Sequence, residues 1–406
     1  MNRVARRGAC PGLLDPMQTG DGLLARLPQT GALAPAAFAA ICRAAARHGN
    51  GLVEVTARGS LQVRGLTPLS VRAFAEACAG AGIVGTGGPV VIASPLGGRD
   101  ASAVVDSADL VVAIRDAVTR YAGKVAPKVS IIVDDGGALH LDALCADIRL
   151  RALPDGRYAL GMAGDSVSAC ALGAVRAGDA LAATVALLDA IATLGRDARA
   201  RDLADARGVV AALAEAAPPV QARPPARFVG RHFLAHGRAA VGIGLAFGQS
   251  EAKVLETLAA AAMDMGATGI APAPERTLLA LELPDGDAFA RLAARLGFIT
   301  RADDPRRAII ACAGAPACAA ALIPTRAMAA EVARVAAPLL AGGGSVHVSG
   351  CAKGCASRAP AALTLVGTAA GAAIIRDGRV GDAPAMIVPV RELVGRVAAL
   401  SVPEPA

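Results

Sequence analysis

The feature that most constrains the fold is a repeated order of secondary-structure patterns along the 406-residue chain. Each copy reads strand, helix, strand, strand, helix, judged from alternation in the strands and from apolar spacings of three and four in the helices. The first copy comprises residues 23–27, 33–48, 51–55, 60–63 and 71–81, and the second comprises residues 240–245, 250–265, 269–273, 277–283 and 288–296. This repeat predicts two α+β modules of ferredoxin-like type that are related by duplication.

The two copies also align in sequence, although few residues are identical. The segment GSLQVRGL, which begins at Gly59, overlays on RTLLALEL, which begins at Arg276. Arg58 then falls on Glu275, one residue short of Arg276. Because such segments are rich in small apolar residues, chance similarity is the alternative to duplication.

The repeat divides the chain into five parts. Each module leads into a more glycine-rich α/β segment, and the proline-rich stretch AEAAPPVQARPPARF reads as a linker between the halves. The predicted parts are module 1 (1–86), an α/β tetrapyrrole-binding lobe (87–213), the linker (214–228), module 2 (229–300) and a cluster-binding α/β lobe (301–406). We therefore predict an α+β protein with two ferredoxin-like half-domains and two α/β lobes.

Composition narrows the class of partner. The formal net charge of +7 suits an anionic partner, but no block of Lys and Arg with interleaved aromatic residues indicates nucleic acid. The N-terminus has no apolar stretch after its positive charges, and the uncharged runs 308–325 and 359–375 contain Pro and Gly. We expect a soluble cytoplasmic protein that binds neither nucleic acid nor membrane.

Four cysteines near the C-terminus form two spaced pairs. Cys312 and Cys318 make C-x5-C within ACAGAPAC, and Cys351 and Cys355 make C-x3-C within CAKGC. Four thiolates are the usual ligand set of a 4Fe–4S cluster, and glycines in both loops let the backbone fold closely around an inorganic core. Zinc prefers shorter C-x2-4-C spacings, so it is the weaker alternative, together with four unrelated buried cysteines.

The remaining cysteines have no such pattern. With nine cysteines and no secretion signal, a disulfide framework is not expected. Cys42, Cys78, Cys145 and Cys170 sit singly among mostly apolar residues, and each is predicted to be a small core residue.

The cysteine spacings resemble the cluster signature of the sirohaem-dependent sulfite and nitrite reductases. In that family the cluster lies beside an iron tetrapyrrole, and its last cysteine, here Cys355, bridges the two metals. EVTARGSLQVRGL (54–66) is similar to the family's T-x-R-Q-x-x-Q segment, and VAPKVS (125–130) resembles its L-P-R-K-F-K segment. The resemblance implies that Arg58 and Lys128 contact carboxylates of a tetrapyrrole.

Two departures from the family pattern concern charge. GGPVVIASPLGGRD (87–100) resembles the R-N-x-x-x-x-P-L-x-G segment, but Pro89 stands where the family has an arginine. Ser130 stands where the family has a second lysine. Reduction of a sulfite or nitrite anion on haem iron needs concentrated positive charge, so these losses argue against a reductase.

One branch of the family, the precorrin-3B synthases, resembles the chain more closely. The similar segments are RRGACPGL (6–13), PMQTGDGLLARL (16–27), VSIIVDDGG (129–137) and HVSGCAKGCA (347–356). That resemblance implies a monooxygenase of aerobic cobalamin biosynthesis, which hydroxylates precorrin-3A at C20 with O2 and NADH and forms a γ-lactone. It also implies a 4Fe–4S cluster and a mononuclear non-haem iron, with the tetrapyrrole as substrate. The alternatives are a sirohaem-dependent reductase, which alone would carry sirohaem, and a non-enzymatic iron–sulfur protein.

The arginines of the T-x-R segment allow a prediction from periodicity. If residues 56–64 form an extended strand, Arg58, Ser60, Gln62 and Arg64 share one face. Two guanidiniums on that face would suit a substrate with carboxylates. Together with the family resemblance, this makes Arg58 and Arg64 predicted substrate contacts. A solvated sheet face is the alternative, and Gly59 could break the strand.

The sequence assigns neither a catalytic residue nor the ligands of an iron. Non-haem iron takes His and carboxylate ligands, and the candidates are His140 with its neighbouring aspartates, and the H-x3-H pair of His232 and His236. GIGLAFG (242–248) lacks the G-x-G-x-x-G spacing of a dinucleotide site. NADH electrons are therefore expected to arrive through a separate reductase partner.

Overall fold

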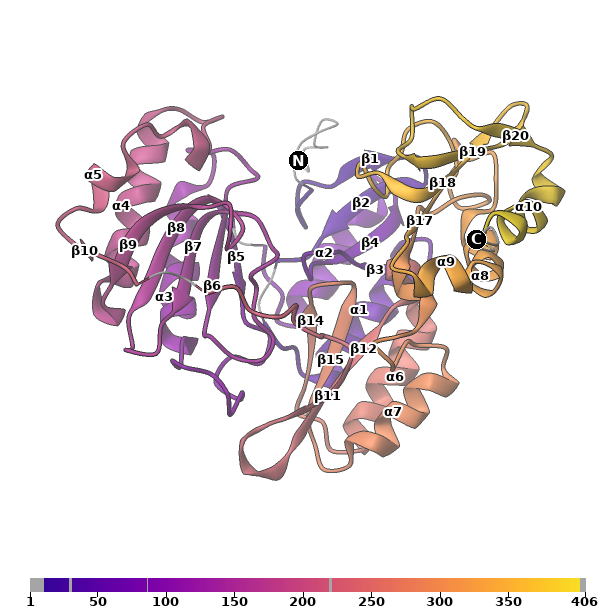
Figure 1. The fold of residues 1–406 in the computed structure, drawn as a ribbon. Helices are drawn as coiled ribbons and strands as arrows, with labels where there is room; N and C mark the ends of the chain where they lie inside the picture. The colour runs from indigo at the N-terminus through magenta and orange to yellow at the C-terminus, as the bar shows by residue number, and fades with distance from the viewer. Residues whose placement is uncertain (1–10, 29–30, 86, 219–220, 402–406) are drawn as a thin grey trace.

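The duplicated organisation that the sequence predicts is present in the structure, a computed structural model that describes residues 11–28, 31–85, 87–218 and 221–401. These residues form four sheets, and each half of the chain supplies a ferredoxin-like half-domain followed by an α/β lobe (Figure 1). Residues 6–10 of the N-terminal RRGACPGL segment lie outside the described residues.

The two half-domains repeat the predicted order of elements. The first comprises β1 (Met17–Thr19), β2 (Gly22–Arg26), α1 (Pro35–His48), β3 (Leu52–Val55), β4 (Leu61–Leu66) and α2 (Ser70–Gly80). The second comprises β11 (Gly230–Phe233), β12 (Ala239–Gly244), β13 (Gln249–Glu251), α6 (Ala252–Asp264), β14 (Gly269–Ala273), β15 (Thr277–Leu283) and α7 (Gly286–Arg295). The overlay of residues 59–66 on 276–283 thus places β4 on β15.

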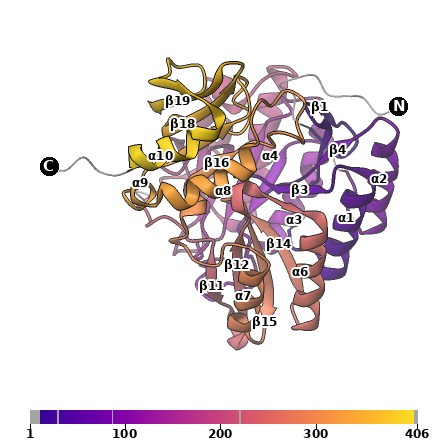
Figure 2. The ribbon, with the colours of Figure 1, turned by 90° about the vertical axis from the view of Figure 1, so that its right-hand side faces the viewer.

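The half-domains share one hydrophobic core. In α1 the buried side chains Phe38, Ile41 and Ala45 recur at helical spacing, and they join the same cluster as Leu255 and Leu258 of α6. Figure 2 shows the helices of both half-domains on one side of the molecule. Backbone pairing also links the two half-domains. Strand β13 of the second half-domain pairs with β3 at the edge of the first sheet, and Leu33 of the first half forms an isolated bridge to Ile270 of β14.

The first lobe is a six-stranded mixed sheet. Its strands are, in order, β10 (Ala214–Glu215), β9 (Cys170–Val175), β8 (Tyr158–Gly164), β7 (Ala146–Ala152), β6 (Ser130–Asp134) and β5 (Val90–Ala93). One face packs against α3 (Ala108–Val118) and α4 (Ala180–Thr193), with α5 (Ala206–Val210) at the edge. The other face, through Ile92 and Ile132, packs against β14 and β15 of the second half-domain. This sheet-on-sheet contact fixes the lobe to the rest of the molecule.

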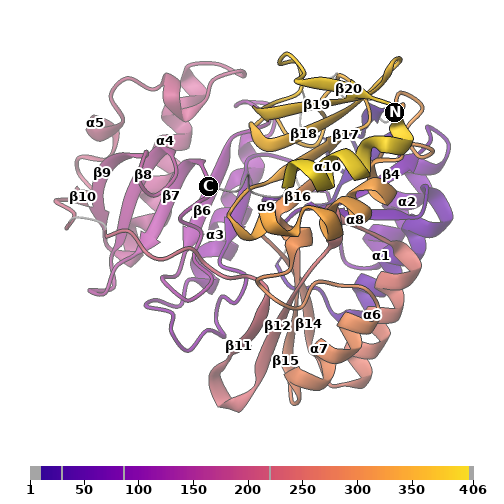
Figure 3. The same ribbon diagram turned by 45° about the vertical axis from the view of Figure 1, so that its right-hand side comes forward.

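The second lobe has the same strand topology. Its order is β16 (Ile309–Ala311), β17 (Val346–Ser349), β18 (Ala361–Thr368), β19 (Gly371–Gly378) and β20 (Met386–Val388). The first three strands are parallel and the last two antiparallel to their neighbours, as in the run from β5 to β9. Figure 3 shows α8 (Thr325–Val335), α9 (Ala337–Ala341) and α10 (Leu393–Ser401) beside these strands. The duplication therefore extends from the half-domains to the lobes.

The predicted linker differs from the structure at its start. Ala214 and Glu215 form β10 and pair with β9, so the sheet of the first lobe continues into residues that were expected to connect the halves. Within the described residues, no helix is both long and apolar enough to cross a membrane.

Candidate functional site

The four C-terminal cysteines lie at one edge of the sheet of the second lobe. Cys312 directly follows β16, and Cys351 follows β17 after Gly350. Since β16 and β17 are adjacent and parallel, their carboxyl ends meet at the same edge of the sheet. Cys318 and Cys355 lie in the loops that continue from these strands, and all four cysteines line a single cavity of about 610 Å³, called here the cysteine cavity.

The surroundings of these cysteines fit an inorganic group held close to the backbone. The N–H of Gly350 donates a hydrogen bond to the Sγ of Cys312 at 3.2 Å, a contact of the kind that tunes cluster potentials. A Cβ on Gly20 would overlap the Sγ of Cys318, so a side chain there would displace that sulfur. Gly314 adopts a φ of +67°, a conformation that glycine reaches without strain.

The spacing of the sulfur atoms separates a cluster from a single ion. Among the described residues, the metal-ligand groups whose atoms all lie within 4.8 Å of one another include none of the four cysteines. A tetrahedral zinc with bonds of about 2.3 Å would place its sulfurs about 3.8 Å apart. As they stand among the described residues, no three of these sulfur atoms lie as close together as a single tetrahedral zinc requires.

A second cavity, of about 900 Å³, adjoins the first. Its walls come from the first half-domain and from both lobes. Cys355 and Lys353 line both cavities, whereas the other three cysteines line the cysteine cavity alone. Cys355 thus lies on the boundary, where a ligand in the second cavity would meet the cysteine site.

Positive charge dominates the second cavity, called here the cationic cavity. Its lining includes seven basic residues: Arg26, Arg58, Lys128, Arg199, Arg201, Lys353 and Arg358. Of the described lining residues, Asp147 alone is acidic, and it accepts hydrogen bonds of 2.8 and 2.7 Å from Arg199. This excess of cations attracts a polyanionic ligand.

Arg58 lines this cavity. It does not lie on a strand, although an extended strand was predicted for residues 56–64. Residues 56–60 form the turn between β3 and β4, and Gly59 has a φ of +76°, which breaks the extended backbone. The guanidinium donates to the carbonyl oxygen of Cys145 at 2.6 Å and to the Oγ of Ser130 at 3.2 Å. Burial lowers the pKa of Arg58. The turn therefore aims Arg58 at the first lobe, across the cationic cavity.

Arg64 is placed differently from its predicted role as a substrate contact. It lies on β4 in the cysteine cavity and forms ion pairs of 2.7 Å with Asp21 and 3.2 Å with Glu54. Burial alone would lower the pKa of Arg64, but these two carboxylates outweigh it and hold the pKa above its ordinary value. Since two acids already neutralise Arg64, its contacts support a structural role in holding the β1–β2 hairpin.

Lys128 is exposed just before β6 and lines the cationic cavity. Sequence reasoning missed the other cations of this cavity. Lys353 could have been found from the sequence, because it lies between the two cysteines of CAKGC. No sequence pattern marks Arg199 and Arg201 as cavity residues, because they belong to a short 3-10 turn that reaches the cavity only in the folded lobe.

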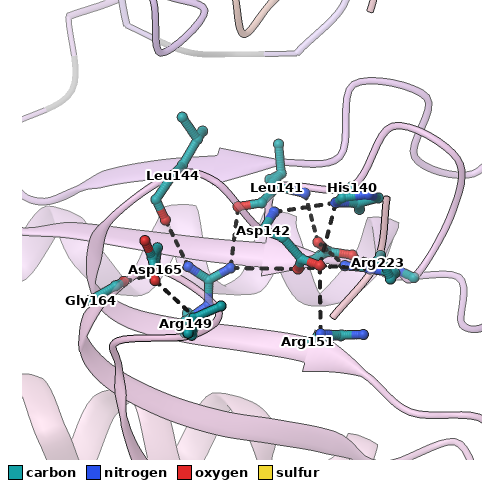
Figure 4. Close-up of polar contacts among 12 residues, drawn as sticks. His140, Leu141, Asp142, Leu144, Arg149, Arg151, Gly164, Asp165 and Arg223 are labelled. Atoms are coloured by element: carbon teal, nitrogen blue, oxygen red, sulfur yellow. Dashed lines mark hydrogen bonds and ion pairs between the residues drawn. The ribbon is translucent and has the colours of Figure 1, made fainter. Parts of the chain in front are cut away.

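The candidate iron ligands around His140 form a buried polar network, drawn in Figure 4. Ligand atoms of Asp134, His140 and Asp142 lie within 4.8 Å of one another. Arg223 of the linker donates to Asp142 at 2.7 and 2.9 Å and to Asp134 at 2.9 Å. The His140 Nε2 lies 2.8 Å from the carbonyl oxygen of Pro224. A guanidinium thus already occupies the cation position between the carboxylates, and these residues do not fit an iron ion.

The expectation for the single cysteines is wrong at two positions. Cys42 and Cys78 are buried in the shared core, as predicted. Cys145 and Cys170 are exposed: Cys145 lies in the loop before β7, and Cys170 begins β9 at the end that β10 does not cover. Cys145 lines the cationic cavity.

The chain was compared with known protein families, curated proteins and solved structures. A family model described as the nitrite/sulfite reductase ferredoxin-like half domain matches residues 15–81, which include the first half-domain from β1 to α2. A protein named precorrin-3B synthase, from Sinorhizobium sp., is 38% identical over 389 residues, which cover 93% of this chain and 84% of that protein.

Among solved structures, the NirA protein of Mycobacterium tuberculosis superposes with a TM-score of 0.70 at 20% sequence identity. The match covers 93% of this chain and 79% of NirA. At this identity the likeness concerns the fold, and it supports the arrangement of two ferredoxin-like half-domains with two α/β lobes.

Proposed function

The chain belongs to the precorrin-3B synthase family, and on that premise we propose that it converts precorrin-3A to precorrin-3B in aerobic cobalamin biosynthesis. The reaction is an O2-dependent hydroxylation at C20 with closure of a γ-lactone from the ring-A acetate. NADH supplies the electrons through a separate donor protein.

One observation carries this proposal: the cationic cavity combines seven basic side chains with a boundary at Cys355. A tetrapyrrole of this pathway bears several carboxylates, and arginine binds carboxylates through two parallel hydrogen bonds. The volume of about 900 Å³ lies within the range of pockets that enclose a ligand of cofactor size. Arg58, Lys128 and Lys353 would bind the carboxylates and orient the ring toward Cys355.

The cavity also accounts for one departure from the reductase pattern. The Oγ of Ser130, where the resemblance places a lysine, accepts a hydrogen bond from Arg58, and its N–H donates to Asp147 at 2.9 Å. Positive charge beside Ser130 is thus supplied by Arg58, from the turn between β3 and β4. Such a redistribution suits a substrate held by its carboxylates rather than a small anion on haem iron.

Cys312, Cys318, Cys351 and Cys355 would hold a 4Fe–4S cluster, which would supply electrons one at a time beside the substrate. We assign no residue to a mononuclear iron, because the His140 group is bound to Arg223.

Product analysis tests the proposal. The anaerobically purified protein would be mixed with precorrin-3A, ¹⁸O2 and a reduced electron donor, and the products analysed by mass spectrometry. We expect a product that has gained one labelled oxygen atom and contains a lactone. A protein that loads its cluster but leaves precorrin-3A unchanged would contradict the proposal, and an intense Soret band from a tightly bound haem would favour the sirohaem reductases instead.

A further inference from the structure

Two turns meet where the cysteine cavity joins the cationic cavity. Thr56 and Ala57, which begin the turn that carries Arg58, line both cavities. The carbonyl oxygen of Ala57 accepts a hydrogen bond of 3.1 Å from the N–H of Glu275, in the turn between β14 and β15. The next residue, Arg276, lines the cysteine cavity. The two turns therefore place one arginine in each cavity, Arg58 in the cationic cavity and Arg276 in the cysteine cavity.

The two arginines differ in their partners, although the duplication gives them nearly equivalent positions. In the overlay of the half-domains, Arg58 falls one residue short of Arg276. Arg58 donates two hydrogen bonds to the first lobe, whereas no described residue forms a hydrogen bond or ion pair with the guanidinium of Arg276. Burial lowers the pKa of Arg276, although the carboxylates of Glu275 and Glu54 oppose this. A half-buried guanidinium without an acceptor is costly, so it indicates an anionic partner from outside the chain.

The backbone of Arg276 has a conformation that glycine adopts more easily. Glu275 and Arg276 both have a positive φ, of +58° and +61°. Side chains disfavour this left-handed region, and proteins tend to keep such strain where it positions a functional group. The stem of Arg276 packs against Gly248, because a Cβ there would come within 2.7 Å of the Cδ of Arg276. The turn thus holds the guanidinium in the cavity at a cost in stability.

A second polar side chain beside Arg276 also lacks a partner. Gln249 follows Gly248, lines the cysteine cavity and is only 6% exposed. Its Oε1 atom has no hydrogen-bond partner among the described residues. The terminal amide carries two N–H donors as well as this oxygen, so a rotation of the amide presents donors to the same space. Gln249 and Arg276 together therefore form a donor site on the wall that the second half-domain contributes.

We propose that Arg276 and Gln249 bind a carboxylate of the substrate, which extends from the cationic cavity past Cys355 into the cysteine cavity. A guanidinium matches the two oxygens of a carboxylate with two parallel hydrogen bonds. Carboxylates around the edge of one tetrapyrrole point in several directions, so a single ligand reaches cations in two adjoining cavities. Arg276 is then a specificity residue for substrates with several carboxylates. This inference rests on the proposed function for the tetrapyrrole nature of the ligand.

A binding titration combined with thermal unfolding tests the assignment. The probe is uroporphyrin III, a tetrapyrrole with several carboxylates, and its fluorescence is followed as it binds the cluster-loaded protein. Arg276→Gly should weaken binding by about tenfold or more, because a charge-assisted hydrogen-bonded pair is lost. Without uroporphyrin III, the same substitution should raise the Tm measured by circular dichroism, since it removes backbone strain and an unpaired, half-buried charge. A residue with a purely structural role would lower the Tm instead.

The neighbouring residue supplies a matched control. Glu275 has the same backbone strain as Arg276 but lines neither cavity. Glu275→Gly should leave the affinity for uroporphyrin III within about twofold of the wild type, and the loss of its surface ion pair with Arg307 should affect the Tm little. Gln249→Leu should weaken binding by less than Arg276→Gly does, because the amide is uncharged.

Four outcomes would overturn the inference. Arg276→Gly and Glu275→Gly could bind uroporphyrin III equally well, or the loss of affinity in Arg276→Gly could come with a lower Tm, which would make its role structural. Arg276→Gly could shift the reduction potential of the cluster with unchanged affinity, which would make the cluster its partner. A wild-type protein that does not bind uroporphyrin III would also refute the binding of carboxylates in the cationic cavity. No precorrin is used, so these outcomes are distinct from failure of the product assay.

Discussion

Removal of Arg223, which Figure 4 shows beside Asp142, should destabilise the first lobe by an amount that follows from the contacts of its guanidinium. Its guanidinium makes three hydrogen bonds of 2.7–2.9 Å to Asp142 and Asp134. The side chains of Asp134 and Asp142 are only 0% and 9% exposed, so Arg223→Ala leaves two buried carboxylates without their main partner. Breaking such a buried pair costs about 3–5 kcal/mol. We expect the lower end, because Arg151 lies 3.6 Å from Asp142 and still compensates part of its charge.

The assay can be confined to this lobe. The chain has no Trp and two Tyr, and both tyrosines, Tyr121 and Tyr158, are buried in the core of the first lobe. Tyrosine fluorescence during urea unfolding therefore reports that lobe, even if the whole chain does not unfold in one step. With a slope of about 2 kcal/mol per molar urea, a loss of about 3 kcal/mol moves the midpoint by about 1.5 M.

The loss of unfolding free energy in Arg223→Ala should also depend on pH. Burial alone would raise the pKa of Asp142, but Arg223, with Arg151 and His140 nearby, holds it below its ordinary value. A depressed carboxyl pKa stabilises the fold above the unfolded value of about 3.9, and this contribution disappears as the pH falls through the folded value. The difference between Arg223→Ala and the wild type should be full at pH 7 and shrink below about pH 4.

A surface pair supplies the control. Arg72 and Glu76 form an ion pair in α2 with side chains that are 84% and 65% exposed, so Arg72→Ala should cost no more than about 0.5 kcal/mol. Two results would refute the stabilising role of Arg223 as the ion-pair partner of Asp134 and Asp142. One is a midpoint shift for Arg223→Ala no larger than that for Arg72→Ala. The other is an effect of Arg223→Ala that is the same at pH 3 and pH 7.

Three further predictions concern the cysteine and cationic cavities. Cys318→Ser should lower cluster iron and sulfide content, whereas Cys170→Ser, at an exposed position, should not; equal content in both variants would remove Cys318 from the ligand set. Gly20→Ala should also lower cluster content, because its Cβ would displace the sulfur of Cys318, while Gly80→Ala, where nothing lies within 4 Å, should leave it unchanged. Lys353→Glu should weaken binding of uroporphyrin III by about tenfold or more in a fluorescence titration, and the loss should shrink as salt rises; unchanged affinity would argue against carboxylate binding in the cationic cavity.

Local patterns were sufficient for the element order and for the recognition of the cysteine pairs. Alternation and helical spacing gave both half-domains, because each element buries one face in a common core. The two cysteine pairs were recognised from their spacings and glycine-containing loops, and the structure brings them together because the adjacent parallel strands β16 and β17 end at the same edge. Alternation failed at Arg58, because Gly59 turns the chain where an extended strand was expected. The linker was predicted from its proline content, which does not show that its first residues, Ala214 and Glu215, pair with β9, a strand far away in the sequence.

The sequence by itself determined the duplicated fold and the four thiols, because both depend on residues close to one another along the chain. Only the tertiary structure decided which charges meet. It gathered the basic side chains of three separate parts around one cavity, paired Arg64 with Asp21 and Glu54, and placed Arg223 between the carboxylates of Asp134 and Asp142. The physical reason is that a charged side chain is neutralised, or left to bind a ligand, by neighbours that come from distant segments, and no local pattern encodes those neighbours.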